Sequence, residues 1–237
     1  MSAVELRTGV DVSLVNCMGS DFDILRAAKV SVQGADVLLE EPGELGGLIG
    51  YLMKHRHGTP FEHASMTFFV RAPIFVFREW HRHRAGWSYN EESARYKQLA
   101  PVFWIPDEKR PIRPVAGFKA ARPCFETDVA LSDLSAHALA TSYRLAYECY
   151  GHQLRDGVAR EVARACLPVG IYSSMFATCN PRSLMHFLSL RTHVETAAHV
   201  SYPQHEIQLC AGQMEDLFAA KFPETYRAFN VSGRVAP

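Results

Sequence analysis

Residues 78–96 read R-E-W-H-R-H-R-A-G-W-S-Y-N-E-E-S-A-R-Y and mix charged side chains with aromatic rings. Arginine and glutamate are seldom fully buried unless they are paired, so this stretch is poor material for a hydrophobic core. Guanidinium groups bind phosphate through paired hydrogen bonds, and aromatic side chains stack on flat rings. The stretch therefore predicts a binding site for a polyanion that carries a ring, with the rest of the fold built around it.

The composition is that of a globular chain without bulk charge. The chain has 237 residues, of which 48% are hydrophobic, and its formal net charge is zero. That apolar content argues against disorder. A neutral chain is not drawn in bulk to nucleic acid or to an acidic membrane, so a polyanion site must be local. We expect a single domain over residues 1–237.

The cysteines and the first residues indicate the compartment. The six cysteines are scattered and form no C-x-x-C pair, which favours reduced thiols over a disulfide framework or a zinc site. Residues 1–10 lack the apolar segment of a signal peptide, and no apolar run reaches the length of a membrane span. We therefore expect a cytoplasmic protein with no membrane partner and no metal.

Hydrophobic periodicity, together with glycine, proline and capping residues, predicts a mixed α+β fold. Strands are predicted over 10–16, 64–71, 94–105 and 171–179. Helices are predicted over 22–30 after a Ser20 cap, 43–54, 74–84, 127–155, 158–167, 180–191 after an Asn180-Pro181 start, and from 203 onward. Loops are predicted over 55–63, 87–92 and 192–202, with a surface excursion over 107–123. The expected architecture is a mixed sheet with several long helices.

Three further arginines, Arg164, Arg182 and Arg191, stand in otherwise apolar helical segments. Taken singly, each fits an ion pair at the edge of the core. Taken with the arginines of 78–96, they favour a large ligand, or more than one, with phosphates. The positive charge of Arg182 is unfavourable beside the positive end of the helix dipole at the start of the helix. The same position is well suited to binding an anion.

Other kinds of site have weaker signals. The histidines of 55–63 fit either a solvated loop or metal ligands, although no acid or cysteine stands at a metal spacing. Ser93 lacks a G-x-S-x-G elbow, the motif contains no cysteine nucleophile, and neither a Rossmann fingerprint nor a P-loop occurs. Interleaved arginines and aromatics also occur in single-stranded nucleic-acid-binding modules. The acids inside the stretch and the zero net charge count against that alternative.

The segment R-H-R…N-E-E-S-A-R-Y at 82–96 resembles the signature of the flavin-dependent thymidylate synthases. Further stretches resemble the same family in the same order: M-G-S-D…A-K-V-S at 18–31, H-G-T-P-F-E-H at 57–63, R-A-P-I-F-V at 71–76, A-R-E-V-A-R-A-C-L-P at 159–168, N-P-R-S-L at 180–184, L-R at 190–191 and Q-H-E-I at 204–207. The resemblance covers most of the chain. It implies the family's fold and a homotetramer whose active sites are shared between subunits.

The resemblance also implies the reaction, in which dUMP and 5,10-methylenetetrahydrofolate give dTMP while NADPH reduces a bound FAD. It assigns the flavin site to Ser31, His57, Thr59, Arg82, His83, Arg84, Asn90, Glu91, Asn180, Arg182 and His186. It assigns dUMP to Glu79, Arg82, Glu91, Glu92, Ser93, Ala94, Arg95, Arg164 and Arg191. Arg191 is the expected catalytic residue, because a fixed cation beside the uracil favours the ionised ring.

The chain departs from the family pattern at a few positions. One extra residue lies between Arg84 and Ser93, around Gly86, which implies a bulge in the loop. Glu79 replaces a common Gln, Ala94 a common Gly and His186 a frequent Asn. No arginine that the mechanism needs is missing.

Overall fold

The computed structural model describes residues 4–38, 45–117, 119 and 122–237, and the chain divides into two compact units. Unit 1 contains Met1–Asp11, Arg71–Arg82 and Asn90–Met175; unit 2 contains Val12–Val70, His83–Tyr89 and Phe176–Pro237. Each unit is assembled from three separate stretches of the chain. A single domain over residues 1–237 stays a prediction.

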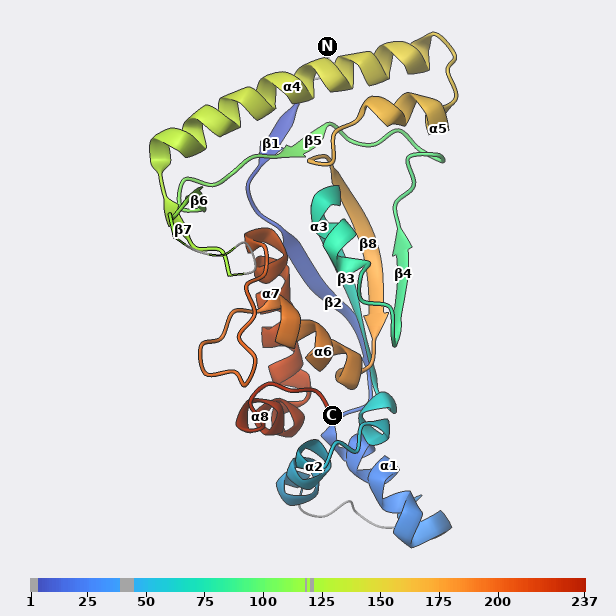
Figure 1. The fold of residues 1–237 in the computed structure, drawn as a ribbon. Helices are drawn as coiled ribbons and strands as arrows, with labels where there is room; N and C mark the ends of the chain where they lie inside the picture. The colour runs from blue at the N-terminus through green and yellow to red at the C-terminus, as the bar shows by residue number, and fades with distance from the viewer. Residues whose placement is uncertain (1–3, 39–44, 118, 120–121) are drawn as a thin grey trace. The chain divides into compact units, whose positions relative to one another are not determined.

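A four-stranded sheet has the strand order β2-β3-β8-β4 (Figure 1). Its strands are β2 (Asp11–Met18), β3 (Ser65–Pro73), β8 (Tyr172–Cys179) and β4 (Trp87–Glu91). Along β3, the buried side chains of Met66, Phe68 and Val70 alternate with more exposed ones, as expected for a strand with one face on a core. The strands predicted over 10–16, 64–71 and 171–179 are confirmed.

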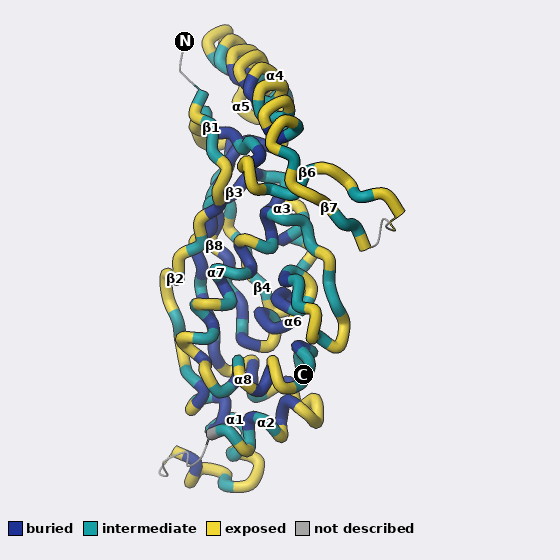
Figure 2. Tube along the Cα trace, turned by 90° about the vertical axis from the view of Figure 1, so that its left-hand side faces the viewer, coloured by how far each residue is buried: buried dark blue, intermediate teal, exposed yellow. Residues whose placement is uncertain are grey.

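Helices make up most of unit 2. They are α1 (Asp21–Gln33), α2 (Leu45–Lys54), α6 (Pro181–Arg191), α7 (His205–Lys221) and α8 (Pro223–Val231), with short 3₁₀ turns η1 (Gly34–Leu38) and η2 (Thr59–Glu62). Ile24, Met214 and Phe218 are fully buried between them, and Figure 2 shows this interior in dark blue. The helices predicted in this part are confirmed within a few residues, although residues 43–44 lie outside the described ones and α8 was not predicted.

The carboxylate of Asp21, at the start of α1, organises the start of α8. Asp21 is only 4% exposed. It accepts hydrogen bonds from the main-chain N–H of Glu224 at 2.8 Å and of Thr225 at 3.0 Å, and from Thr225 Oγ1 at 2.6 Å. An anion at a helix N-terminus satisfies N–H groups that have no partner inside the helix.

Replacing Asp21 with alanine is expected to lower the free energy of unfolding by about 3 kcal/mol, because buried donors lose a charged acceptor. Asp21→Asn keeps one acceptor oxygen and is expected to lose less. Urea denaturation followed by circular dichroism measures both variants. A change within about 0.5 kcal/mol, as for ordinary surface substitutions, would contradict this role.

Unit 1 holds α3 (Ile74–Trp80), the 27-residue α4 (Val129–Arg155), α5 (Arg160–Ala163) and the 3₁₀ turn η3 (Arg164–Cys166). Its short strands are β1 (Glu5–Arg7), which pairs in parallel with β5 (Val102–Trp104), and β6 (Pro111–Pro114), which pairs antiparallel with β7 (Phe125–Thr127). Phe103 stacks on Tyr143 with ring centroids 4.6 Å apart, and Tyr147 and Tyr150 join the same buried cluster. The long helix predicted over 127–155 is confirmed, as are the mixed strand directions of an α+β protein.

The helix predicted over 74–84 is too long, because α3 ends at Trp80. The His81 N–H still bonds to the Phe77 carbonyl, but the Arg82 N–H turns to the Glu79 carbonyl, three residues back. Trp80 is fully buried, whereas Arg82 and Arg84 are exposed. The chain therefore leaves the helix where its side chains no longer suit the core.

Two predictions after Gly86 are also wrong. Residues predicted as a loop over 87–92 include β4, in which Trp87 and Tyr89 alternate with more exposed residues and stack with their rings 12° from parallel. The strand predicted over 94–105 is reduced to β5, because the N–H groups of Tyr96 and Lys97 both bond to the Ser93 carbonyl and form a turn. The stretch 78–96 thus contains a strand, and the alternation of aromatic and polar residues over 87–90 was the signal available for it.

Candidate active site

Segments of unit 2 that carry predicted flavin-site residues meet α6 at three junctions, two at its start and one at its end. Arg182, in its first turn, donates through Nη1 to Glu62 Oε1 at 2.6 Å and through Nε to the Pro237 main-chain oxygen at 2.7 Å. A Cβ built on Gly58 would lie 2.5 Å from Arg182 Cζ, so the glycine leaves room for this guanidinium. The structure thus joins the 57–62 segment to α6.

The turn at Gly86 forms the second junction with α6. Asn180 caps the helix, its side chain accepting a hydrogen bond from the Ser183 N–H at 2.8 Å. Gly86 has φ +68°, and a Cβ there would overlap Ser183 Oγ and lie 2.9 Å from Asn180 Nδ2. Only glycine adopts this conformation without strain while approaching so closely. The extra residue in this loop coincides with a tight turn that leads directly into β4.

His83 and Arg191 form the third junction, at the other end of α6. Arg191 Nε donates to His83 Nε2 at 3.0 Å. The His83 ring also meets Phe187 edge-on with centroids 4.8 Å apart, and the Tyr89 hydroxyl donates to the His83 carbonyl at 2.7 Å. The expected catalytic arginine and an expected flavin-site histidine are therefore in direct contact, and the histidine is fixed from several sides.

The protonation state of His83 follows from this environment. Burial, and then the charges of Arg191 and His186, lower the pKa of the His83 imidazole to about 4. The ring is therefore neutral at pH 7. Since Nε2 accepts a hydrogen bond from Arg191, the proton resides on Nδ1. His83 therefore accepts the hydrogen bond of Arg191 and, being neutral, does not repel its positive charge.

This pKa predicts how stability depends on pH. Between about pH 6.5 and about pH 4, the unfolded chain binds a proton at His83 that the folded chain does not, so stability falls as pH drops through that window. His83→Gln keeps an acceptor for Arg191 but cannot titrate. The wild-type melting temperature is expected to fall by about 2–4 °C more than that of His83→Gln between pH 7 and pH 5. Parallel pH profiles of the two proteins would contradict this assignment.

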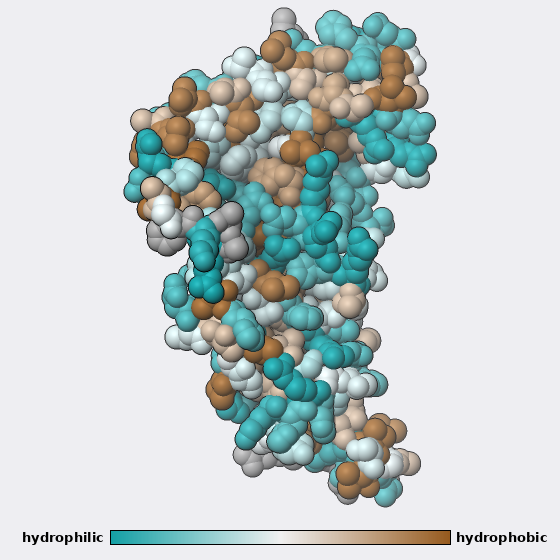
Figure 3. All heavy atoms as spheres, viewed as in Figure 1, coloured by the Kyte–Doolittle hydropathy of each residue, from teal (hydrophilic) through white to brown (hydrophobic). Residues whose placement is uncertain are grey.

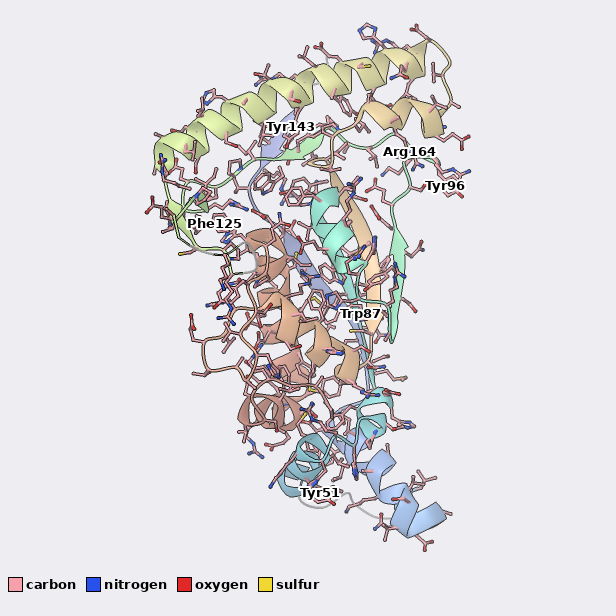
Figure 4. All side chains as sticks on the ribbon, in the orientation of Figure 1. Tyr51, Trp87, Tyr96, Phe125, Tyr143 and Arg164 are labelled. Atoms are coloured by element: carbon pink, nitrogen blue, oxygen red, sulfur yellow. The ribbon has the colours of Figure 1, made fainter. Side chains whose placement is uncertain are left out.

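The remaining flavin-site candidates of unit 2 are all exposed: Ser31, His57, Thr59, Arg84 and His186. Ser31 donates to the Ala28 carbonyl at 3.1 Å within α1. His57 meets the Tyr51 ring edge-on at 5.9 Å, and Tyr51 is labelled in Figure 4. These side chains are open to solvent, and exposed donors of this kind are suited to a large anionic ligand.

Most nucleotide candidates lie in unit 1, where a cavity of about 320 Å³ opens next to η3. Five of the predicted residues line it: Glu91, Glu92, Ser93, Ala94 and Arg164. Ile74, Leu167 and Ile171 supply apolar walls. Apolar walls with a few polar groups are typical of small-molecule sites.

Arg164 is the main cation of this cavity (Figure 4). Within the part of the chain that the structure describes, its guanidinium has no hydrogen-bond or ion-pair partner. Of the two acids, Glu92 is paired with Lys97 Nζ at 2.8 Å. Arg95 does not line the cavity and is bridged to Glu161 at 3.2 Å, an exposed pair of the kind that contributes little and opens readily.

Other candidates of unit 1 stand apart from this lining. Glu79 lies in α3, Arg82 follows its end, and Asn90 is exposed on β4. Ser173 was not predicted, yet it lines the cavity, is 2% exposed, and its Oγ has no partner among the described residues. A polar residue at a buried position of the predicted 171–179 strand was the signal available for it. Among the described residues, no three His, Cys, Asp or Glu side chains form a possible metal site.

Comparison with known proteins shows similarity over nearly the whole chain, beyond the short motifs described in the sequence. A family profile described as thymidylate synthase complementing protein matches residues 13–224. A protein of Streptomyces avermitilis named flavin-dependent thymidylate synthase is 54% identical over 235 residues, which are 98% of this chain and 95% of that protein. A Tropheryma whipplei protein of the same name is 47% identical over 230 residues, covering 96% of this chain and 95% of its own.

A solved structure is also similar to this chain, in both sequence and fold. The UMP/dUMP methylase PolB from Streptomyces cacaoi, crystallised with 5-Br UMP and with 5-Br dUMP, superimposes with a TM-score of 0.91 at 46% identity. The match covers 99% of this chain and 100% of the PolB chain. The sequence comparison and the structural comparison therefore both extend over nearly the whole chain.

Proposed function

Because this chain belongs to the family of flavin-dependent thymidylate synthases, we propose that it methylates dUMP to dTMP, with 5,10-methylenetetrahydrofolate as carbon donor and NADPH-reduced FAD as hydride source. The observation that carries the proposal is the hydrogen bond between Arg191 and His83. It joins the residue expected at the pyrimidine to a residue expected at the flavin.

The donors of unit 2 fit a flavin dinucleotide. His57, Arg84 and His186 are exposed around Arg182, whose guanidinium lies against Gly58. Arginine binds diphosphate bidentately, and glycine lets a main chain approach a ligand closely. We propose that Thr59, Asn180 and Arg182 hold the dinucleotide portion and that His83 and Arg84 face the ring system. When bound, the flavin supplies the hydride that reduces the transferred carbon.

The cavity of unit 1 fits a nucleoside monophosphate. Arg164 offers an unpaired guanidinium to the phosphate, and the apolar walls of Ile74, Leu167 and Ile171 suit the sugar or base. Glu91, Glu92 and Ser93 provide acceptors and a hydroxyl for the sugar. We assign Arg82 and Arg95 to the same nucleotide on the family resemblance, Arg95 after release from Glu161.

Arg191 performs the central electrostatic step in this proposal. Its charge stabilises negative charge on the uracil as the ring is activated, so no enzyme thiolate is needed. His83 orients Arg191 through Nε2 and, being neutral, leaves the guanidinium as the cation at that position. Because the Arg191 guanidinium is in place before the reaction begins, no free energy is spent on reorganising it during the reaction.

We extend the proposal to assembly and location. A homotetramer with shared active sites is supported by apolar side chains left exposed near the start of α4, including Val129 at 52% and Leu134 at 67% exposure. Figure 3 shows hydrophobic side chains at several points along that helix. Exposed apolar residues mark protein contacts when they gather on one surface. In the described ranges, no helix has the length and apolarity to cross a membrane; we propose a cytoplasmic location.

One anaerobic experiment tests the proposed reaction. The FAD-loaded, NADPH-reduced protein is mixed with methylenetetrahydrofolate and dUMP, and dTMP is assayed. We expect flavin oxidation coupled to dTMP formation. A colourless protein that makes no dTMP would overturn the proposal, whereas a yellow protein active on UMP alone would overturn only the deoxynucleotide assignment.

The single-stranded nucleic-acid-binding alternative has no comparable support. Each relative reported above is named as an enzyme, and a formal net charge of zero gives no bulk attraction for a polynucleotide backbone. Binding of a fluorescent oligonucleotide at physiological salt would revive it.

A further inference from the structure

Two cysteines of unit 1 meet beside the cavity that contains Arg164. Cys149 lies in the last turns of α4, and Cys166 ends η3. The amide nitrogen of Gln153 lies 3.5 Å from Cys149 Sγ and 3.6 Å from Cys166 Sγ, so one donor contacts both sulfurs. The two thiols, which are distant in sequence, are thus held as neighbours.

We propose that Cys149 and Cys166 form a reversible disulfide that weakens nucleotide binding by displacing Arg164. The effect on the nucleotide rests on the proposed function, whereas the bond itself does not. In the structure both cysteines are reduced.

The surroundings of the two thiols set the order of the chemistry. Cys149 is exposed, whereas Cys166 is partly buried and its Sγ donates to the Ala163 carbonyl at 3.2 Å. Burial, and then the neighbouring Cys149 thiol, raise the pKa of Cys166. Since thiolate character and exposure govern oxidation, a peroxide reaches Cys149 first.

The reaction balances with hydrogen peroxide as the two-electron oxidant. Cys149 thiolate attacks one peroxide oxygen, gives a sulfenic acid and releases water after protonation. Cys166 then attacks the Cys149 sulfur, the S–O bond breaks, and a second water leaves with the Cys166 proton. A dithiol such as dithiothreitol reverses the bond by thiol–disulfide exchange.

The bond is expected to move η3 rather than α4. A disulfide holds its sulfurs about 2.05 Å apart, closer than any non-bonded contact of two thiols. Cys149 is anchored in a 27-residue helix, whereas Cys166 belongs to a three-residue 3₁₀ turn that begins with Arg164. Pulling Cys166 toward α4 therefore turns the residue that we assign to the phosphate.

Intact-protein mass and peptide mapping test the bond. The full-length, flavin-loaded protein is treated with hydrogen peroxide and its remaining thiols are blocked with N-ethylmaleimide. We expect a linked peptide that contains Cys149 and Cys166, absent after dithiothreitol. Alkylation of both residues after peroxide treatment would overturn the proposal.

Kinetics and equilibrium binding test the consequence. The KM for dUMP is expected to rise about tenfold on oxidation with little change in kcat, since a displaced Arg164 loses much of its charged hydrogen bonding to the phosphate. Calorimetric titration with dUMP reads the same effect without turnover. Cys149→Ser is expected to be insensitive to peroxide. The control Cys124→Ser removes a different thiol of unit 1, which is partly buried, and should respond to peroxide like the wild type.

The outcomes separate this proposal from the proposed function. A 149–166 disulfide that leaves dUMP affinity unchanged would overturn the link to Arg164. A protein that forms the disulfide but neither binds nor methylates dUMP would overturn the proposed function and the link, while the modification site would stand.

Discussion

Arg191→Ala is expected to lower kcat for dTMP formation by at least about 100- to 1,000-fold, the usual cost of removing one preorganised electrostatic group. Flavin should remain bound, because Arg182, Asn180 and the Gly58 segment hold one another independently of Arg191. The loss should appear in kcat more than in the KM for dUMP, since the charge acts on the activated ring.

Anaerobic single-turnover oxidation of the reduced flavin, with parallel assay of dTMP, measures the effect of Arg191→Ala. Arg191→Lys keeps the positive charge but loses the Nε–H bond to His83, so an intermediate rate is expected. Arg144→Ala, which removes an exposed arginine from α4, is the matched control and should be silent. A fully active Arg191→Ala protein would remove Arg191 from the mechanism, and loss of flavin would make its role structural.

Arg164→Ala is expected to raise the KM for dUMP by about 30- to 100-fold, because a charged hydrogen-bonding group contributes about 2–3 kcal/mol to binding. Arg164 lines the cavity, and among the described residues its guanidinium has no hydrogen-bond or ion-pair partner. Removing the side chain therefore leaves no described group without its partner. The variant should therefore fold normally and approach the wild-type kcat at saturating dUMP.

Steady-state kinetics and calorimetric dUMP titration measure the effect of Arg164→Ala. Arg95→Ala tests the second predicted arginine and is expected to cost less, because Arg95 starts outside the cavity in an ion pair with Glu161. If Arg164→Ala instead lowered kcat at an unchanged KM, Arg164 would contribute to the chemical step rather than to binding.

The sequence predicted the elements whose local signals agree with one another. The helix from Pro181 to Arg191 has a side-chain cap, a proline at its first position and a regular apolar stripe, and the structure contains it as expected. The helix over 127–155 has no glycine or proline until its last turns and a capping Asp128. In both segments, propensity, capping and packing favour the same conformation.

The prediction failed in the stretch whose residues we assign to a ligand rather than to the core. In 81–105 the arginines and histidines obscure the end of α3, and the alternation of β4 extends over only five residues. Contacts such as Arg182 with Glu62, 120 residues apart, and Arg191 with His83, 108 residues apart, have no local signal at all. The family resemblance named Arg182, Arg191 and His83 individually, but only the fold shows which residues they touch.

The bond between Asp21 and the start of α8 has a consequence for biosynthesis. Its partners are separated by 203 and 204 residues, so the carboxylate emerges from the ribosome long before the N–H groups that satisfy it. Unit 2 combines Val12–Val70 and His83–Tyr89 with Phe176–Pro237, so it cannot close before the last of these stretches has been made. Until synthesis is complete, the nascent chain exposes its apolar faces, a condition that favours aggregation and calls for chaperones.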